Sequence, residues 1–279
     1  MERLVNNVDD AVACADAVAT EINDSFPNFM RQAFNCQPGF DDRIQANREI
    51  VCRSGIYSMK KKYVLLVLDR EGKRIHPDDD KALYTKGSDI ATSTTPELVK
   101  KMLKESTLMA LRGEPKTKID DRILTFRRSL KNINSNTELN VLEFAMITSI
   151  KKYDEYYEKW KRIEKPGLGE VKGIPYQVRA AINFNAFLDT IDDKNTQKLI
   201  GGQKVKVLWL KPNEQGFKAM AFASDLDRLP PWFNAHFEVD LEATEAKLID
   251  SKLEKVYGPL GWQIPTEHSV KVGQLLNFE

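Results

Sequence analysis

A short apolar run at residues 63–68 is the feature that most constrains how this chain folds. The run reads Tyr-Val-Leu-Leu-Val-Leu, a composition typical of a β-strand. Residues 69–72 follow it as a predicted turn, and residues 50–57 offer an apolar partner strand. We therefore expect a small antiparallel sheet early in the chain.

Most of the remaining chain has the three- and four-residue apolar spacing of helices. The clearest pattern covers residues 8–34, where Pro27 is expected to break or restart the helix. Another helix is predicted to start at Thr95, a good N-cap, with Pro96 in the first helical position. Further helices are predicted at residues 118–131, 137–163, 175–188 and 242–256, and a β-hairpin at residues 205–210 and 219–223.

These elements predict an α+β fold, in which a small antiparallel sheet with helices is followed by a mainly helical region carrying a β-hairpin. The composition changes near Ser93, so we expect one domain at residues 1–95 and another at residues 96–279. The sequence contains no apolar run near the ~18 residues of a membrane span. Residues 1–20 lack the basic and apolar regions of a secretory signal.

The cysteines and histidines argue against a disulfide framework and a structural zinc site. The cysteines are odd in number and form no closely spaced pair, which is typical of a reducing compartment. The histidines lie far apart, without neighbouring ligands at zinc-site spacing. These residues are Cys14, Cys36, Cys52, His76, His236 and His268.

The net charge is only +1, but the charges are unevenly distributed. Residues 1–24 carry a net charge of −5, and residues 237–257 carry −3. Residues 48–74 and 97–133 each carry +5. A surface that binds a nucleic-acid duplex needs positive charge concentrated in one place, so the middle of the chain is where we expect such a surface.

Lys60, Lys61, Lys62 and Tyr63 form the most prominent basic feature. Lysine head groups at the start of a strand can reach phosphates, and a tyrosine ring can pack against a sugar. Successive strand residues face opposite ways, so the lysines line one surface only at a strand edge. The alternative interpretation is a solvated strand start, at which lysine prevents edge-to-edge pairing.

A second basic feature surrounds the start of the predicted helix at residues 175–188. Lys172 precedes a Gly-Ile-Pro stretch that sets a helix entry, and helix N-terminal amides attract phosphate. Arg179 and Asn183 share a helix face, and Asn185 follows them. These residues predict a clamp on a nucleic-acid backbone, and the alternative is a capped helix with ordinary surface charge.

A third basic feature is a stripe of cationic residues on the predicted helix at 118–131. It is either a phosphate-facing surface or a solvated helix face. The stripe contains Arg122, Arg127, Arg128 and Lys131.

The sequence offers no constellation of catalytic residues. It has no Gly-rich phosphate loop and no nucleophile signature beside a histidine. Adjacent aspartates occur, but they are predicted at helix ends and turns, whereas two-metal phosphoryl transfer needs carboxylates on rigid strands. We therefore predict no catalytic residue and no metal site in this chain.

The order of these features resembles the C-terminal part of the T-even-type phage replicative DNA polymerases, which belong to family B. Over most of the chain after about residue 40, the similar stretches follow in family order. They are residues 47–50, 55–57, 60–64, 69–72, 86–87, 93–96, 172–185, 202–210 and 240–260.

The resemblance implies that residues 1–95 complete a polymerase palm and residues 96–279 form its thumb. It implies DNA contacts near the primer end and along the upstream duplex. The residues in these roles are Lys60, Lys61, Lys62, Tyr63, Lys86, Lys172, Arg179, Asn183 and Asn185. It also implies a terminal peptide that binds a sliding clamp, at Gln274, Leu275, Leu276 and Phe278, although this tail has a single aromatic residue.

One departure from the family is decisive for the expected activity. Family B polymerases hold two Mg²⁺ ions with an Asp-Thr-Asp motif and an earlier aspartate, and this sequence contains no Asp-Thr-Asp. We therefore expect the second piece of a split or truncated polymerase. Its nucleotidyltransferase activity would need a partner piece carrying the aspartates, and Mg²⁺ would bind in the assembled enzyme, in the cytoplasm of an infected bacterial host.

Two alternatives come from other functional classes. One is a stand-alone, non-enzymatic protein that binds duplex DNA without a partner. The other is a clamp-interacting accessory factor whose active element is the C-terminal tail.

Overall fold

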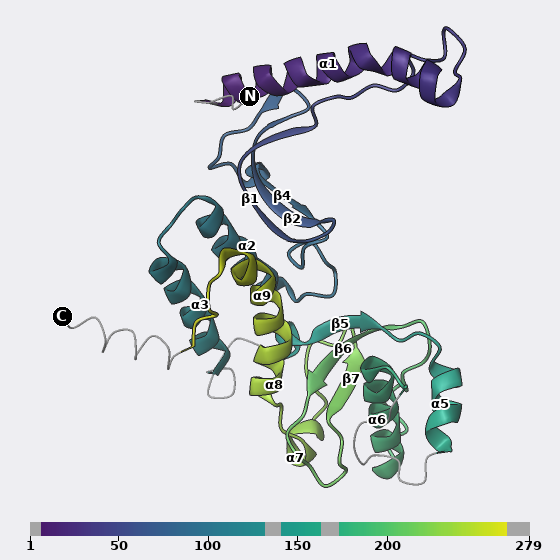
Figure 1. Cartoon of the computed structure of the whole chain (residues 1–279). Helices are drawn as coiled ribbons and strands as arrows, with labels where there is room; N and C mark the ends of the chain where they lie inside the picture. Colours follow the sequence, from purple (N-terminus) through teal and green to yellow (C-terminus); the bar gives the residue numbers. More distant parts are fainter. Residues whose placement is uncertain (1–6, 132–140, 163–172, 267–279) are drawn as a thin grey trace, which may run out of the picture. The chain divides into compact units, whose positions relative to one another are not determined.

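The computed structural model describes residues 7–131, 141–162 and 173–266, and the chain forms two compact units (Figure 1). The N-terminal unit comprises residues 1–86 together with 111–113. The C-terminal unit comprises residues 87–110 and 114–279. The division falls between Lys86 and Gly87, a few residues before the boundary expected from composition.

An antiparallel sheet forms the centre of the N-terminal unit, as the sequence predicted. β1 (Ile50–Met59) and β4 (Leu83–Lys86) both pair with β2 (Lys62–Arg70), so β2 is the central strand. The apolar run of β2 is accordingly buried, with Leu66 fully inaccessible. The β2 strand extends to Arg70, and the following turn consists of Glu71 and Gly72, both with positive φ, before the short β3 (Lys73–Arg74).

The first helix, α1 (Val8–Phe34), has the predicted limits but continues through Pro27. The predicted break is wrong because the helix is held on both sides of the proline. On the N-terminal side, the amide of Asn23 donates to the carbonyl of Ala46 at 2.9 Å. On the C-terminal side, Arg31 forms an ion pair with the buried carboxylate of Asp41.

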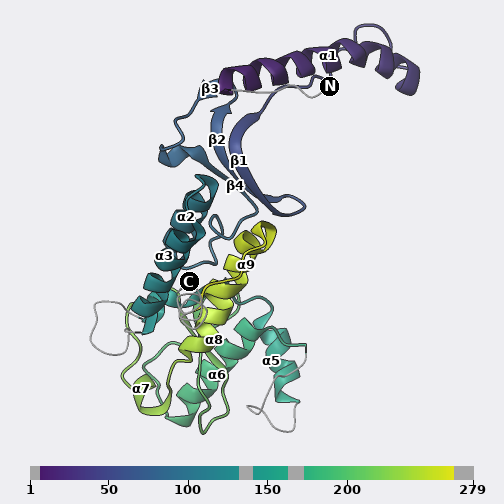
Figure 2. The same ribbon diagram turned by 60° about the vertical axis from the view of Figure 1, so that its left-hand side comes forward.

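Helices α2 (Glu97–Leu111) and α3 (Lys116–Lys131) are present where the pattern predicted helices, and they lie side by side in Figures 1 and 2. The predicted helix at 242–256 is also present, but it is divided. It runs from α8 (Leu241–Glu245) through a π-helical turn (Ala246–Asp250) into α9 (Ser251–Tyr257). The Tyr257 hydroxyl donates to Asp120 of α3 at 2.9 Å, and burial and this carboxylate raise its pKa far above the usual value.

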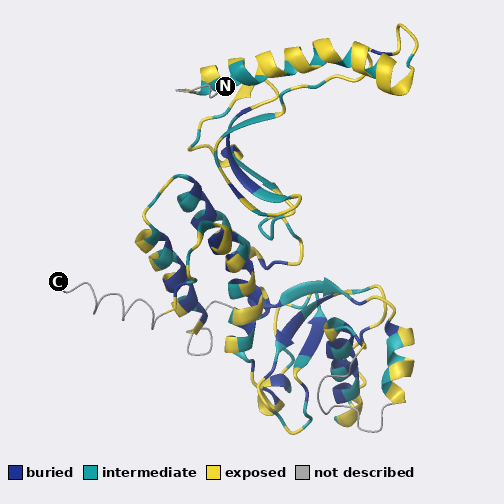
Figure 3. Ribbon diagram, viewed as in Figure 1, coloured by how far each residue is buried: buried dark blue, intermediate teal, exposed yellow. Residues whose placement is uncertain are grey.

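A second antiparallel sheet lies in the C-terminal unit, in the order β5-β6-β7. The strands β6 (Lys204–Trp209) and β7 (Ala219–Ala223) are the predicted hairpin, and α6 (Tyr176–Thr190) packs against β7. The remaining helices of this unit are α5 (Tyr153–Lys161) and the short α7 (Phe233–His236). Figure 3 shows buried residues along β6, β7 and α6, whereas β5 is of intermediate exposure.

The predicted helix at 137–163 is confirmed only at residues 153–161 and is wrong for residues 141–152. The described part of this region contains a 3-10 turn (Val141–Phe144), the strand β5 (Met146–Ser149) and α5. β5 pairs with β6, so that Met146 lies opposite Val207. Pairing with a strand distant in sequence overrides the local helical spacing. Among the described residues, no helix has the length and apolarity required to cross a membrane.

Candidate nucleic-acid interface

The predicted lysines gather at one end of the N-terminal sheet. Lys60 and Lys61 form the turn between β1 and β2, and Lys62 is the first residue of β2. Lys86, at the end of β4, pairs with Tyr63. Lys60, Lys61 and Lys86 are exposed, and none of the four lysines forms an ion pair with a described residue.

This position differs from the strand edge that the sequence suggested. β2 is paired on both sides, so the lysines do not protect one of its edges. Lys61 instead occupies a left-handed turn position, with φ of 62°. A non-glycine residue in this region is uncommon and somewhat strained. The turn projects two adjacent positive charges beyond the end of the sheet.

Three tyrosines form a row beside this turn. Tyr57 lies directly opposite Tyr63 on the neighbouring strand, with ring centroids 5.6 Å apart. Tyr63 continues the row to Tyr84 on β4, at 6.3 Å. Tyr57 is 63% exposed, which leaves much of its ring surface available for contact.

A glycine shapes the sheet surface next to the row. A Cβ atom at Gly55 would lie only 2.7 Å from Cδ2 of Leu65 and 3.1 Å from the ring of Tyr57. Only glycine lets the leucine and the tyrosine ring lie this close to the strand. At the other end of the row, the guanidinium of Arg70 lies 5.1 Å from the centre of the Tyr84 ring, a cation–π distance.

The opposite end of the sheet is neutralised by internal ion pairs. The carboxylate of Asp69, only 1% exposed, pairs with Arg48 and, at 2.5 Å, with Arg74. Burial acts to raise the pKa of Asp69, but the hydrogen bonds from Arg48, the Gly72 amide and Arg74 together hold the pKa below its usual value. Arg48 and Arg74 are therefore held in internal ion pairs, unlike the lysines at the turn end.

The second predicted feature is only partly available for binding. Helix α6 begins directly after Pro175, as expected, whereas Lys172 lies outside the described residues. Asn185 is buried, and its amide donates to the Leu199 carbonyl at 2.8 Å and the Tyr153 hydroxyl at 2.7 Å. Its side-chain oxygen accepts from the Leu199 amide at 2.8 Å.

Asn183 is also used within the C-terminal unit, since its amide donates to the Ala219 carbonyl at 2.9 Å. The two asparagines hold α6 to its own unit. Their side chains are therefore engaged in internal hydrogen bonds, and we assign neither Asn183 nor Asn185 to DNA binding. Arg179 is half-buried, and its Nε atom is buried without a hydrogen-bond partner among the described residues. Among the described residues of the predicted clamp, Arg179 is the one whose side chain forms no hydrogen bond or ion pair with another described residue.

The third predicted feature, the cationic stripe on α3, does not face solvent as a unit. Arg127 is buried and pairs with Glu245, at 3.0 Å, and with Asp250. Arg122 pairs with Glu105 at 2.5 Å. These contacts hold α3 within its own unit, so both interpretations of the stripe were wrong for Arg127.

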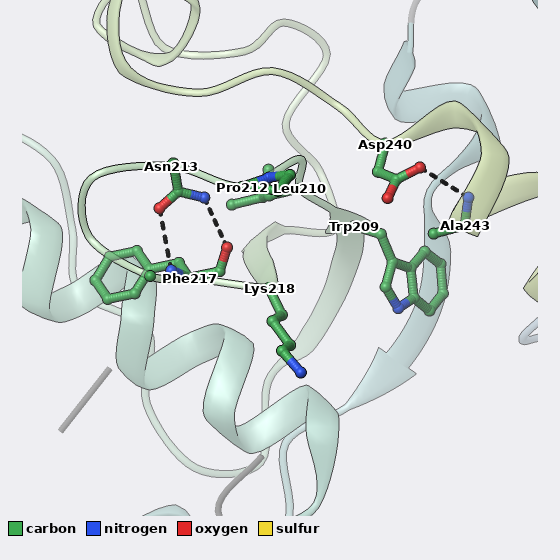
Figure 4. A pocket seen from close by; sticks show the side chains of 9 residues that line it. Trp209, Leu210, Pro212, Asn213, Phe217, Lys218, Asp240 and Ala243 are labelled. Carbon is green, nitrogen blue, oxygen red and sulfur yellow. Dashed lines mark hydrogen bonds between the residues drawn. The ribbon is translucent and has the colours of Figure 1, made fainter. Parts of the chain in front are cut away.

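A pocket of about 420 Å³ lies beside the β6–β7 hairpin (Figure 4). Two of its polar side chains, Asn213 and Asp240, form hydrogen bonds to the neighbouring backbone. Asn213 donates to the Phe217 carbonyl at 2.7 Å and accepts from the Phe217 amide at 3.0 Å, while Asp240 caps α8 through the Ala243 amide at 2.8 Å. The pocket therefore offers an apolar wall but no convergent catalytic groups.

Within the described ranges, no three histidine, cysteine or acidic side chains lie together as a possible metal site. The predicted clamp-binding residues Gln274, Leu275, Leu276 and Phe278 lie outside those ranges. Sequence reasoning missed Tyr84 as a member of the row. Its aromatic character was visible, but its place beside Tyr63 depends on the β2–β4 register.

No protein-family model matches the chain, and no curated protein matches it.

Proposed function

We propose that this chain binds primer-template DNA as the late-palm and thumb portion of a family B DNA polymerase whose catalytic carboxylates belong to another polypeptide. One observation carries the proposal. Four lysines without ion pairs among the described residues surround the turn end of a sheet that also presents a row of three tyrosines. The ordered resemblance to the polymerase family supports the same assignment.

The two kinds of side chain suit two parts of a nucleic acid. Lysine ammonium groups at Lys60, Lys61 and Lys86 bind phosphate oxygens and release the counterions of the duplex. The exposed face of Tyr57 packs against a sugar or base, and the ring of Tyr63 supports it from the neighbouring strand. Alternation along β2 places Lys62 on the face opposite Tyr63, so we assign Lys62 a weaker, longer-range contribution.

In the C-terminal unit, Arg179 is the described residue we assign to the duplex backbone. In this proposal the contribution of the chain is to position DNA, and the catalytic Mg²⁺ ions belong to the partner polypeptide that carries the aspartates.

The test is a titration of fluorescently labelled primer-template duplex with the full chain at several salt concentrations. The double variant Lys60→Ala/Lys61→Ala should weaken binding and lower the salt slope by about 0.9 for each phosphate that the variant no longer binds. Lys73→Ala is the matched control, because Lys73 is an exposed lysine of the same sheet at the end away from the turn. Equal effects of the two changes would refute the turn assignment.

The polymerase part of the proposal needs a separate test. The chain is mixed with a candidate polymerase piece that contains the Asp-Thr-Asp motif, and primer extension is followed. Extension that depends on both polypeptides is expected. DNA binding without any such rescue would instead favour the stand-alone DNA-binding protein.

A further inference from the structure

One side of helix α1 is polar and contacts the rest of the N-terminal unit. Asp9, Asp16 and Asn23 recur at seven-residue intervals and so lie on one side of the helix. Asp9 pairs with Arg74 at 2.6 Å, and Asp16 pairs with Arg48 at 2.7 Å. Asn23 exchanges hydrogen bonds with the backbone of Ala46 at 2.9 and 2.6 Å.

An apolar side of α1 is thereby left partly uncovered, half-buried at Val8, Ala11 and Ala15 but exposed at Val18, Ile22, Ser25 and Phe29. Its residues alternate at spacings of three and four, which is the a/d pattern of a coiled coil. We call this set the α1 seam, and it comprises Val8, Ala11, Ala15, Val18, Ile22, Ser25 and Phe29. The polar member does not interrupt it, because the Ser25 hydroxyl donates back to the Ile22 carbonyl at 2.7 Å.

The seam is exposed where its side chains are largest. Val18 is 45% exposed, Ile22 39% and Phe29 54%, and no described residue of α1 is fully buried (Figure 3). An amphipathic helix normally buries its apolar stripe against the core. Here polar contacts anchor the helix and the stripe remains exposed from Val18 to Phe29, which is typical of a surface that binds another protein.

The acidic residues beside the seam indicate which kind of partner can bind to it. Glu21 lies beside the seam on the flank away from Asp9 and Asp16, Asp10 lies further round on the same flank, and neither forms an ion pair with a described residue. In an antiparallel pair of two copies, the Glu21 carboxylates would face each other and repel. An acidic flank is also repelled by anionic lipid surfaces.

We propose that the α1 seam docks an amphipathic helix of a partner protein, with an apolar a/d stripe flanked by lysine or arginine. The basic flank of such a helix complements Glu21 and Asp10, while its apolar stripe covers Val18, Ile22 and Phe29. This docking surface is separate from the lysine turn and does not depend on the DNA-binding proposal.

The test uses the full chain and two designed helical peptides with the same leucine and isoleucine a/d stripe. One peptide carries lysine at the flanking positions, and the other carries glutamate. The lysine peptide should bind, detected by fluorescence anisotropy, and the glutamate peptide should bind at least tenfold more weakly. Absence of binding by the lysine peptide, or equal binding of both, would overturn the proposal.

Variants then locate the contact. Ile22→Asp and Phe29→Asp should each weaken the lysine peptide at least tenfold, while Ala13→Asp, an exposed position on the far side of the same helix, should change binding less than twofold. Circular dichroism of each variant checks that the helix persists. Unchanged binding by a folded Ile22→Asp variant would overturn the assignment to the seam.

The other occupants give distinguishable results. Sedimentation of the chain alone should show a monomer, and a dimer that Ile22→Asp dissociates would replace the proposal with self-association. Binding to vesicles that contain anionic lipid, abolished by the same variant, would replace it with a membrane surface. Because DNA affinity is measured with separate variants, failure of the seam proposal leaves the DNA proposal standing.

Discussion

Tyr57 and Tyr63 lie opposite each other on adjacent antiparallel strands, with ring centroids 5.6 Å apart. The exposed Tyr57 ring is therefore braced by a neighbour that is itself in contact with Tyr84. This bracing reduces the conformational freedom that Tyr57 would lose when it binds a ligand. The lysines of the turn stand beside a contact surface that is already ordered.

Tyr57→Ala should weaken primer-template binding by about 1 kcal/mol, roughly fivefold, because the variant has no ring to pack against a sugar or base. Tyr57→Phe keeps the ring and should bind nearly normally. Fluorescence anisotropy with labelled duplex measures both. Since the ring is largely exposed, thermal unfolding of both variants should remain close to that of the parent chain, and equal affinities of the two variants would contradict the role given to the ring.

Lys61→Gly should separate the turn's stability from its charge. Lys61 has a φ of 62°, which glycine adopts at little cost, so we expect stability to rise by about 1 kcal/mol. The same change removes one positive charge and should lower the salt slope of DNA binding by about 0.9. Denaturant unfolding and binding titrations measure the two effects, and a variant with higher stability and an unchanged slope would show that Lys61 does not contact phosphate.

The parts of the fold that the sequence predicted are those determined locally. The run at 63–68 and the periodic segments at 8–34 and 118–131 were each assigned from neighbouring residues, and each is present. The strand β5 was missed because it is defined by pairing with β6. A short apolar segment such as Met146–Ser149 has no local signal that separates a strand from a helix.

The candidate site was predictable to a similar degree. Lys60, Lys61, Lys62 and Tyr63 are contiguous in the sequence, and their position at a strand start could be read from it. The burial of Asn185 could not be predicted from the sequence, because asparagine is usually exposed. It is buried here because its amide bonds Leu199 and Tyr153, which are distant in sequence. The uncovered seam of α1 was equally hidden, because periodicity shows that a helix is amphipathic but not which side its own unit uses.

Asn185→Ala should reduce stability without affecting DNA contacts. The side chain satisfies both the amide and the carbonyl of Leu199, and its removal leaves buried polar groups unpaired, at a cost of about 2 kcal/mol. Chemical denaturation measures that decrease in stability. The salt slope of DNA binding, measured where the variant is folded, should match the parent chain, and a smaller slope would restore Asn185 to the residues assigned to DNA.

Asp69→Asn should destabilise the N-terminal unit by about 3 kcal/mol at neutral pH, because it leaves Arg48 facing a neutral group in a buried setting. The folded-state pKa of Asp69 lies below its unfolded value, so its stabilisation is fully present above the unfolded pKa, ordinarily about 4. It is then lost as the pH falls from that value through the lowered folded pKa, where both states become protonated.

The difference in unfolding free energy between the parent and Asp69→Asn should accordingly stay constant from pH 7 to about pH 5 and shrink below about pH 4. Urea unfolding across that range, with Asp42→Asn as an exposed control, measures the difference. A difference that persists unchanged at the lowest pH would show that the ion pairs with Arg48 and Arg74 are not what stabilises this end of the sheet.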